Sequence, residues 1–142
     1  MAPIDTQTDR SKDLTIHVCT GEISVDEILT ALRKFWFGEV TKAVLWDMVE
    51  AEPNLHEPEI HKIDTFLQQI HRQKLGYKRR EGKTALVGAS QYILRILRQF
   101  KAWAEAVGDI AFEFQVFNDI EEAMQWLTSR INEVSTQFTA ST

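Results

Sequence analysis

Two histidines and two glutamates, His56, Glu57, Glu59 and His61, have the residue types of a metal site. Helical zinc sites place two histidines four residues apart with a glutamate beside the first, which puts both rings on one face. Here the histidines are five residues apart, and Pro58 lies between them. Acidic side chains are stabilised at the positive end of a helix, so we interpret the group as a solvated helix start. We expect no metal.

The segment Val87-Gly88-Ala89-Ser90 is the nearest approach to a phosphate-binding loop. A strand end meets a helix start there, and the free N–H groups of a helix start can hold an anion. A nucleotide site needs several glycines at such a turn, and this one has a single glycine. We therefore predict a tight turn with a helix cap, and keep an anion or ligand contact at Gly88 and Ser90 as the alternative.

Two basic features are candidates for binding. Six basic residues lie between positions 71 and 83 against a single acid, Glu81: Arg72, Lys74, Lys78, Arg79, Arg80 and Lys83. We interpret this cluster as a charged surface loop, with contact to phosphates or to an acidic partner as the alternative. On the third predicted helix, Arg95, Arg98 and Lys101 flank an apolar stripe that includes Trp103, which is also the composition of a helix lying on a membrane surface. Packing on a sheet explains the same stripe, so this face is a tentative interaction or membrane-surface site.

No nucleophile or general base stands out. The chain has no Gly-x-Ser-x-Gly elbow, and its one cysteine, Cys19, has no partner for an internal disulfide. His17 lies in the middle of an alternating segment, so we interpret it as a solvent-facing or hydrogen-bonded strand histidine. We assign no catalytic residue and expect neither enzymatic activity nor a cofactor.

The composition predicts one globular unit. The chain has 142 residues, 44% of them hydrophobic, and a formal net charge of −5, which argues against a general nucleic-acid footprint. No apolar run is long enough to span a membrane, and residues 1–12 resemble neither a secretory signal nor an anchor, so we predict a cytoplasmic protein. We expect a flexible segment over 1–12, an α/β domain over 13–134 and a flexible tail over 135–142.

Apolar periodicity predicts alternating strands and helices. Leu14, Ile16 and Val18 alternate with polar neighbours until Gly21 breaks the first strand, and helical spacing follows from a capping box at Ser24 to a left-handed stop at Gly38. The later elements are a central strand at 43–47, a loop at 49–58, a helix from Pro58 to about Leu75, a strand at 84–87, a helix from Ser90 to Gly108, an edge strand at 112–117 and a helix at 119–131. The order βαβαβαβα predicts an α/β fold: a mostly parallel sheet of four to five strands with helices on its faces.

Two segments carry a resemblance to a known family. GKTALVGASQYILRILRQFKAWAE (82–105) and FEFQVFNDIEEAMQWL (112–127) resemble the SpoIIAA-like family of small bacterial proteins, related to STAS domains and in fold to CRAL-TRIO lipid carriers. The closing motif comprises Val116-Phe117, Asp119, Glu121-Glu122-Ala123 and Trp126-Leu127, and the likeness covers residues 13–131. It implies a STAS-like sheet with helices on its faces, a regulatory or binding role and no cofactor. The last helix is then expected to pack on the sheet through Phe117, Ala123, Trp126 and Leu127.

The chain departs from that family at its regulatory turn. Phosphorylatable anti-sigma factor antagonists carry an Asp-Ser-Ser-Gly-like turn where this sequence has Asn54-Leu55-His56-Glu57-Pro58-Glu59. No serine or threonine occurs between Thr41 and Thr65, so the phosphoserine site is not carried over.

Three functions follow as hypotheses. The first is a non-enzymatic STAS-like module acting through a protein partner or as a homodimer. The second is a carrier of a lipid or small apolar ligand, which needs a cavity of roughly 300 Å³ or more beside the third helix. The third, an enzyme, needs a cleft in which His56, His61 or Asp47 meets another titratable group.

Overall fold

The computed structural model describes residues 3–54, 57–72, 79, 81–107 and 112–129. In these ranges the elements follow one another as β1 (Ile4–Asp9), β2 (Leu14–Ser24), α1 (Val25–Trp36), β3 (Ala43–Asn54), α2 (Glu57–Arg72), β4 (Gly82–Val87), α3 (Gln91–Val107), β5 (Phe112–Phe117) and α4 (Ile120–Thr128).

The strands form one five-stranded sheet in the order β1-β2-β3-β4-β5. β1 is antiparallel to β2, and the other neighbouring pairs are parallel. The predicted α/β fold with a mostly parallel sheet is therefore confirmed, as are the central place of β3 and the edge place of β5. The short apolar run of β3 reflects this position, because a central strand is covered on both faces.

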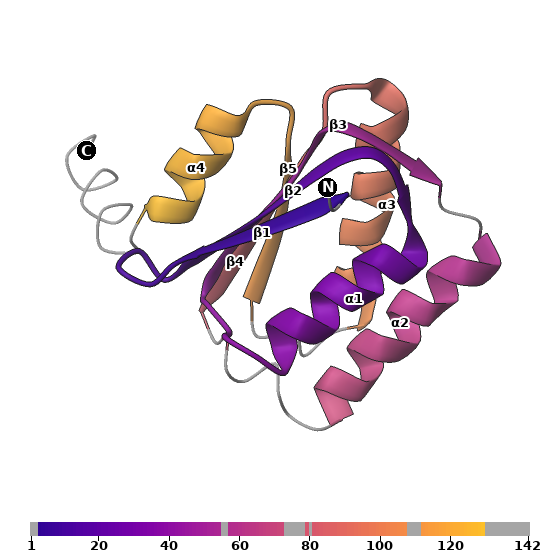
Figure 1. Cartoon of the computed structure of the whole chain (residues 1–142), viewed down its shortest axis with the longest axis horizontal. Coiled ribbons are helices and arrows are strands. Elements are labelled where there is room, and N and C mark those ends of the chain that lie inside the picture. The colour runs from indigo at the N-terminus through magenta and orange to yellow at the C-terminus, as the bar shows by residue number, and fades with distance from the viewer. Residues whose placement is uncertain (1–2, 55–56, 73–78, 80, 108–111, 130–142) are drawn as a thin grey trace.

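The helices cover the two faces unequally (Figure 1). Helices α1, α2 and α3 lie on one face, and α4 lies on the other. Right-handed crossovers between strands that follow each other across a sheet place successive helices on one face. Helix α4 follows the last strand, so no crossover constrains it. It packs on the second face, where Ala123 and Leu127 are buried against Leu45 and Ala85.

The closing motif packs as the family resemblance implied. The ring of Phe117 at the end of β5 meets the ring of Trp126 on α4, with centroids 5.6 Å apart. Ala123 is 0% exposed and Leu127 is 7% exposed, so both belong to the core of this face. The expectation for these four residues is confirmed. Helix α4 ends at Thr128, and the rest of the predicted helix, to residue 131, lies partly outside the described residues.

Strand β1 was not predicted. The expectation of an unpatterned, flexible segment over residues 1–12 is wrong for Ile4–Asp9, which pairs along its whole length with β2. Its side chains beyond Ile4 are exposed, so the strand lacks the apolar alternation by which strands are recognised. Backbone hydrogen bonds to β2 hold it in place, and these do not depend on side-chain type.

Strands β2 and β3 are longer than predicted. Gly21 does not end β2: it has a φ of +70° within the strand, and pairing with β3 continues to Ser24 after a register shift between Val18 and Thr20. The predicted loop over 49–58 is therefore wrong up to Asn54, because β3 follows β2 along this extension. Gly21 follows this irregularity directly, and glycine tolerates its left-handed conformation.

The ends of the helices match the sequence in part. Ser24 and Glu27 form the predicted capping box of α1, with Glu27 N–H donating to Ser24 Oγ at 3.3 Å. Gly38 is not in the left-handed conformation that was expected. A side chain there would collide with the carbonyl oxygen of Lys34, so the close approach of the chain to α1 requires glycine. Helix α2 includes Pro58 in its first turn, as predicted, and ends at Arg72.

Candidate functional site

An apolar cavity lies between the sheet and the layer formed by α1, α2 and α3. Its volume is about 100 Å³. Five aromatic side chains contribute to its walls: Phe35, Trp36, Trp46, Phe100 and Phe114. The remaining apolar walls include half-buried residues of the three helices: Ile28, Leu32, Leu67 and Ile96. The described lining has three polar members, His17 of β2, Thr84 of β4 and Arg79.

His17 is held at the inner face of the sheet by its neighbours. Its ring is 1% exposed, and it stacks on Trp46 of β3 with centroids 4.1 Å apart. The ring of Phe35 meets it edge to face with centroids 6.2 Å apart, and Nδ1 is 2.8 Å from the hydroxyl of Thr6 on β1. Burial, and secondly the positive charge of Arg79, lower the pKa of His17 to about 4. The imidazole is therefore neutral at pH 7.

Arg79 joins the ends of β3 and β4. Its Nε donates to the carbonyl of Thr41 at 2.9 Å, and Nη1 donates to the hydroxyl of Thr84 at 2.7 Å. Its Nη2 donates to the carbonyls of Lys42 at 2.9 Å and Lys83 at 2.8 Å. The planar guanidinium suits this arrangement because its donors diverge in a fixed fork. Arg79 therefore satisfies backbone oxygens at the point where two central strands begin.

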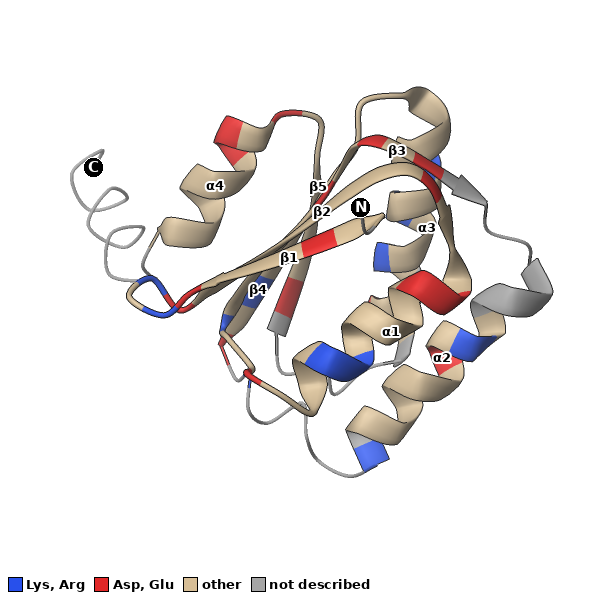
Figure 2. Cartoon of the chain, viewed as in Figure 1, with Lys and Arg blue, Asp and Glu red and all other residues tan. Residues whose placement is uncertain are grey.

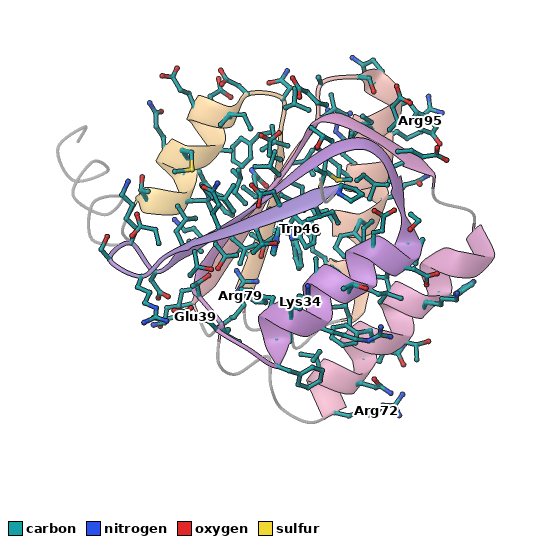
Figure 3. All side chains as sticks on the ribbon, in the orientation of Figure 1. Lys34, Glu39, Trp46, Arg72, Arg79 and Arg95 are labelled. Carbon is teal, nitrogen blue, oxygen red and sulfur yellow. The ribbon has the colours of Figure 1, made fainter. Side chains whose placement is uncertain are left out.

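The charge of Arg79 is buried beside the cavity. Arg79, labelled in Figure 3, is 3% exposed, and its guanidinium carbon lies 5.6 Å from the centroid of the Phe35 ring. Burial lowers the pKa of Arg79 to about 9, against an opposing effect of Asp13, so the group stays protonated at pH 7. The cavity thus has aromatic walls and one end that carries a neutral imidazole near a cation.

The described residues around the cavity include neither a metal-ligand cluster nor a reactive thiol. No described group of three or more His, Cys, Asp or Glu side chains could hold a metal ion. The cavity volume of about 100 Å³ is also well below the size expected of a carrier. The buried thiol of Cys19 is outside the described lining, and burial, followed by the charges of Asp47 and Glu27, raises its pKa to about 12. A thiol with a raised pKa is a poor nucleophile.

The tight turn and helix cap predicted at Gly88 and Ser90 are present. Gly88 N–H donates to the carbonyl of Phe117 at 3.1 Å, and Ser90 Oγ accepts from Ile93 N–H at 3.1 Å. A Cβ at Gly88 would lie 2.7 Å from Ile93 Cγ2, so glycine is needed for the close packing of α3 on β4. Both groups are used within the fold, as the helix-cap interpretation predicted, and nearby Glu50 and Glu52 disfavour an anion.

The basic face of α3 is at the surface. Arg95 and Arg98 are exposed beside a shallow hollow shared with Gln91 and Gln99, and Figure 3 shows Arg95 near one end of α3. Lys101 pairs with Glu105, one turn further on, at 2.6 Å. The side chain of Trp103 lies outside the described residues. No helix in the described ranges is long and apolar enough to cross a membrane.

The basic cluster at 71–83 does not behave as one solvated loop. Arg79 is buried, and Lys83 Nζ donates to the carbonyl and hydroxyl oxygens of Ser129 at 3.1 and 2.9 Å. Two of its six basic residues therefore hold the fold together, and the charged-loop interpretation is wrong for them. Arg72 is exposed, whereas Lys74, Lys78 and Arg80 lie outside the described residues. Of the candidate metal group, the side chains of His56, Glu57 and Glu59 also lie outside the described residues. His61 is exposed on α2.

The sequence did not place His17 or Arg79 at a cavity. His17 is hydrogen-bonded, as one of its two interpretations expected, and it is buried rather than solvent-facing. One signal could have identified His17: it shares a strand face with Thr15 and Cys19, two uncharged residues, and all three are buried. Nothing in the sequence separates Arg79 from Lys78 and Arg80, because two of its partners are carbonyl groups just before a strand that is distant in the chain.

A second feature lies on the surface where β3 ends and α3 begins. We call it the Tyr92 surface and define it by Val49, Glu50, Glu52, Ser90 and Tyr92, which line a shallow hollow. Tyr92 is 59% exposed and Val49 is 36% exposed, two of the three large apolar side chains described as exposed. Figure 2 shows acidic residues along this end of β2 and β3. The surface combines an aromatic centre with a negative border.

Comparison with known proteins addresses the fold. No protein-family model matches the chain, and no curated protein matches it in sequence. Among solved structures, it is similar to an uncharacterised protein of the DUF3478 family from Shewanella loihica PV-4, which has a SpoIIAA-like fold. The TM-score is 0.56 with 18% identity, over 89% of this chain and 95% of that one. This chain has a SpoIIAA-like fold. The fold expected from residues 82–105 and 112–127 is thus confirmed.

Proposed function

We propose that this protein is a non-enzymatic regulatory module of the cytoplasm that binds a protein partner through the Tyr92 surface. The observation that carries this proposal is the exposure of Tyr92 and Val49 at 59% and 36% around one hollow. Large apolar side chains gathered on a surface mark interaction sites more often than scattered ones do. Tyrosine is also among the residues that contribute most to binding energy at protein interfaces.

The charges around the hollow indicate the kind of partner. Glu50 and Glu52 line it, and Glu22 is the register partner of Glu52 on the neighbouring strand. These glutamates are exposed. A partner with a basic rim and an apolar centre would be complementary to this surface, and the charges would act mainly on the association rate. A second copy of the chain carries the same negative charges here, so we favour a different protein.

The carrier hypothesis has weaker support. Pockets that enclose ligands of drug size or larger measure roughly 300 Å³ or more, and a lipid needs at least that much space. The cavity beneath α1, α2 and α3 measures about 100 Å³. The interaction module is therefore the better account of this chain.

Photocrosslinking in the cell of origin tests the proposal. A benzophenone-bearing phenylalanine replaces Tyr92 in one full-length variant and the exposed Thr30 of α1 in a matched control. We expect an adduct with one other protein from position 92 and none from position 30. Adding Glu50→Lys and Glu52→Lys to the first variant should reduce the adduct several-fold. An adduct between two copies of this chain would replace the proposed partner with a homodimer, and crosslinking no stronger at 92 than at 30 would contradict the proposal.

A further inference from the structure

The cavity has the size of one small molecule. Its volume is about 100 Å³. An apolar cavity of roughly 150 Å³ engineered in another protein stays free of water and binds benzene. The space between the sheet and helices α1, α2 and α3 is therefore on the scale of a single ring, and it is too small for an acyl chain.

The walls favour an aromatic ring over a saturated one. Phe35 and Trp36 meet edge to face, with centroids 5.4 Å apart at 86°, and Phe100 and Phe114 do so at 5.7 Å and 77°. Aromatic rings gain energy from such contacts beyond the area they bury. All four residues and Trp46 line the cavity, so a ring placed there meets aromatic edges and faces from helices and strands.

His17 supplies a polar contact at one point of this apolar space. Thr6 occupies Nδ1 at 2.8 Å, so Nε2 is the ring nitrogen available to a bound molecule. Burial and the charge of Arg79 lower the pKa of His17 to about 4, and a neutral imidazole uses Nε2 either as donor or as acceptor. A hydroxyl both donates and accepts, so it pairs with Nε2 in either tautomer.

We propose that the cavity binds a small molecule with one aromatic ring and one hydroxyl group, the hydroxyl hydrogen-bonded to His17 and the ring packed among Phe35, Trp46 and Phe100. Half-buried Leu67 of α2 and Ile96 of α3 form part of the walls near the surface. This site is separate from the Tyr92 surface and does not depend on the protein-binding proposal.

Titration of the full chain with phenol tests this inference, with toluene and cyclohexanol as matched probes that lack the hydroxyl or the aromatic ring. Binding is followed by NMR of the methyl groups of Met48, Ile63 and Ile93, which line the cavity. We expect saturable shifts of these methyl groups with phenol, and affinity at least about tenfold weaker for cyclohexanol. His17→Phe should keep the binding of toluene and remove the advantage of phenol over it.

Filling the cavity provides the second control. Leu67→Trp should abolish the shifts while circular dichroism and Tm show a folded protein, and Ile96→Trp fills the space from the opposite helix if the first variant does not fold. Absence of methyl shifts in the parent protein up to the solubility limit of phenol would overturn the proposal. Equal binding by a folded Trp variant, or equal affinities for phenol and toluene in the parent, would overturn it too.

Discussion

The burial of His17 makes the stability of this protein depend on pH within a defined window. The pKa of His17 is about 4 in the folded protein, against the ordinary value of 6.5 that applies to the unfolded chain. Between these two values the unfolded chain binds a proton that the folded protein does not. The free energy of unfolding therefore falls as the pH falls from about 6.5 to about 4. Each pKa unit corresponds to about 1.4 kcal/mol, so the full loss is about 3 kcal/mol.

Urea denaturation at pH 7 and at pH 4.5, followed by tryptophan fluorescence, measures this loss. At pH 4.5 His17 alone should lower the free energy of unfolding by about 2 kcal/mol relative to pH 7. His17→Gln keeps a hydrogen-bonding group near Thr6 but cannot titrate, so its loss between the two pH values should be smaller by that amount. His61→Gln, at an exposed position of α2, is the matched control for the loss of one histidine. The reasoning fails if His17→Gln and the parent lose the same free energy, or if NMR titration finds His17 protonated with a pKa near 6.5.

Three further predictions concern the interior. Arg79→Met removes a donor from the backbone carbonyls of Thr41, Lys42 and Lys83, so urea denaturation should show a loss of at least about 3 kcal/mol; a loss below about 1 kcal/mol would contradict the role of Arg79. In Gly88→Ala the new Cβ would lie 2.7 Å from Ile93 Cγ2, so Ile93 must move. Urea denaturation should then show a loss of about 1–3 kcal/mol in the free energy of unfolding, whereas an unchanged stability would mean that α3 shifts freely. The raised pKa and burial of Cys19 predict no reaction with a disulfide reagent at pH 8 until urea unfolds the chain; fast labelling of the native protein would refute this.

The alternation of strands and helices could be predicted because its signals are local. Apolar spacing, the capping box at Ser24 and the polar face of β5 are properties of neighbouring residues, and they remain the same in any tertiary setting. Strand β1 shows the limit of this approach. It is an edge strand with exposed side chains, and only its pairing with β2 reveals it. The extension of β3 beyond Asp47 likewise depends on β2 continuing beside it.

The roles of charged and titratable residues could be predicted far less well. Lys83 and Arg79 belong to a segment whose composition is typical of a solvated loop, yet both donate hydrogen bonds to backbone carbonyls of other elements. His17 lies in the middle of a strand, and nothing in its neighbouring residues marks it as neutral. Its ring is buried by Trp46 and Phe35, which are distant in the sequence, and this burial lowers its pKa. Tyr92 lies within the helix predicted from Ser90 to Gly108, and its exposure beside Val49 depends on where β3 ends.

The amino-acid sequence by itself determined the order of the elements, the parallel character of the sheet and the apolar faces that the helices bury. The spacing of buried residues repeats within each helix or strand, so it can be recognised from a single sequence. The tertiary structure alone decided which polar groups lost their contact with water, where the cavity formed and which apolar side chains stayed exposed. Those properties depend on distances between residues far apart in the chain, and the sequence does not contain these distances.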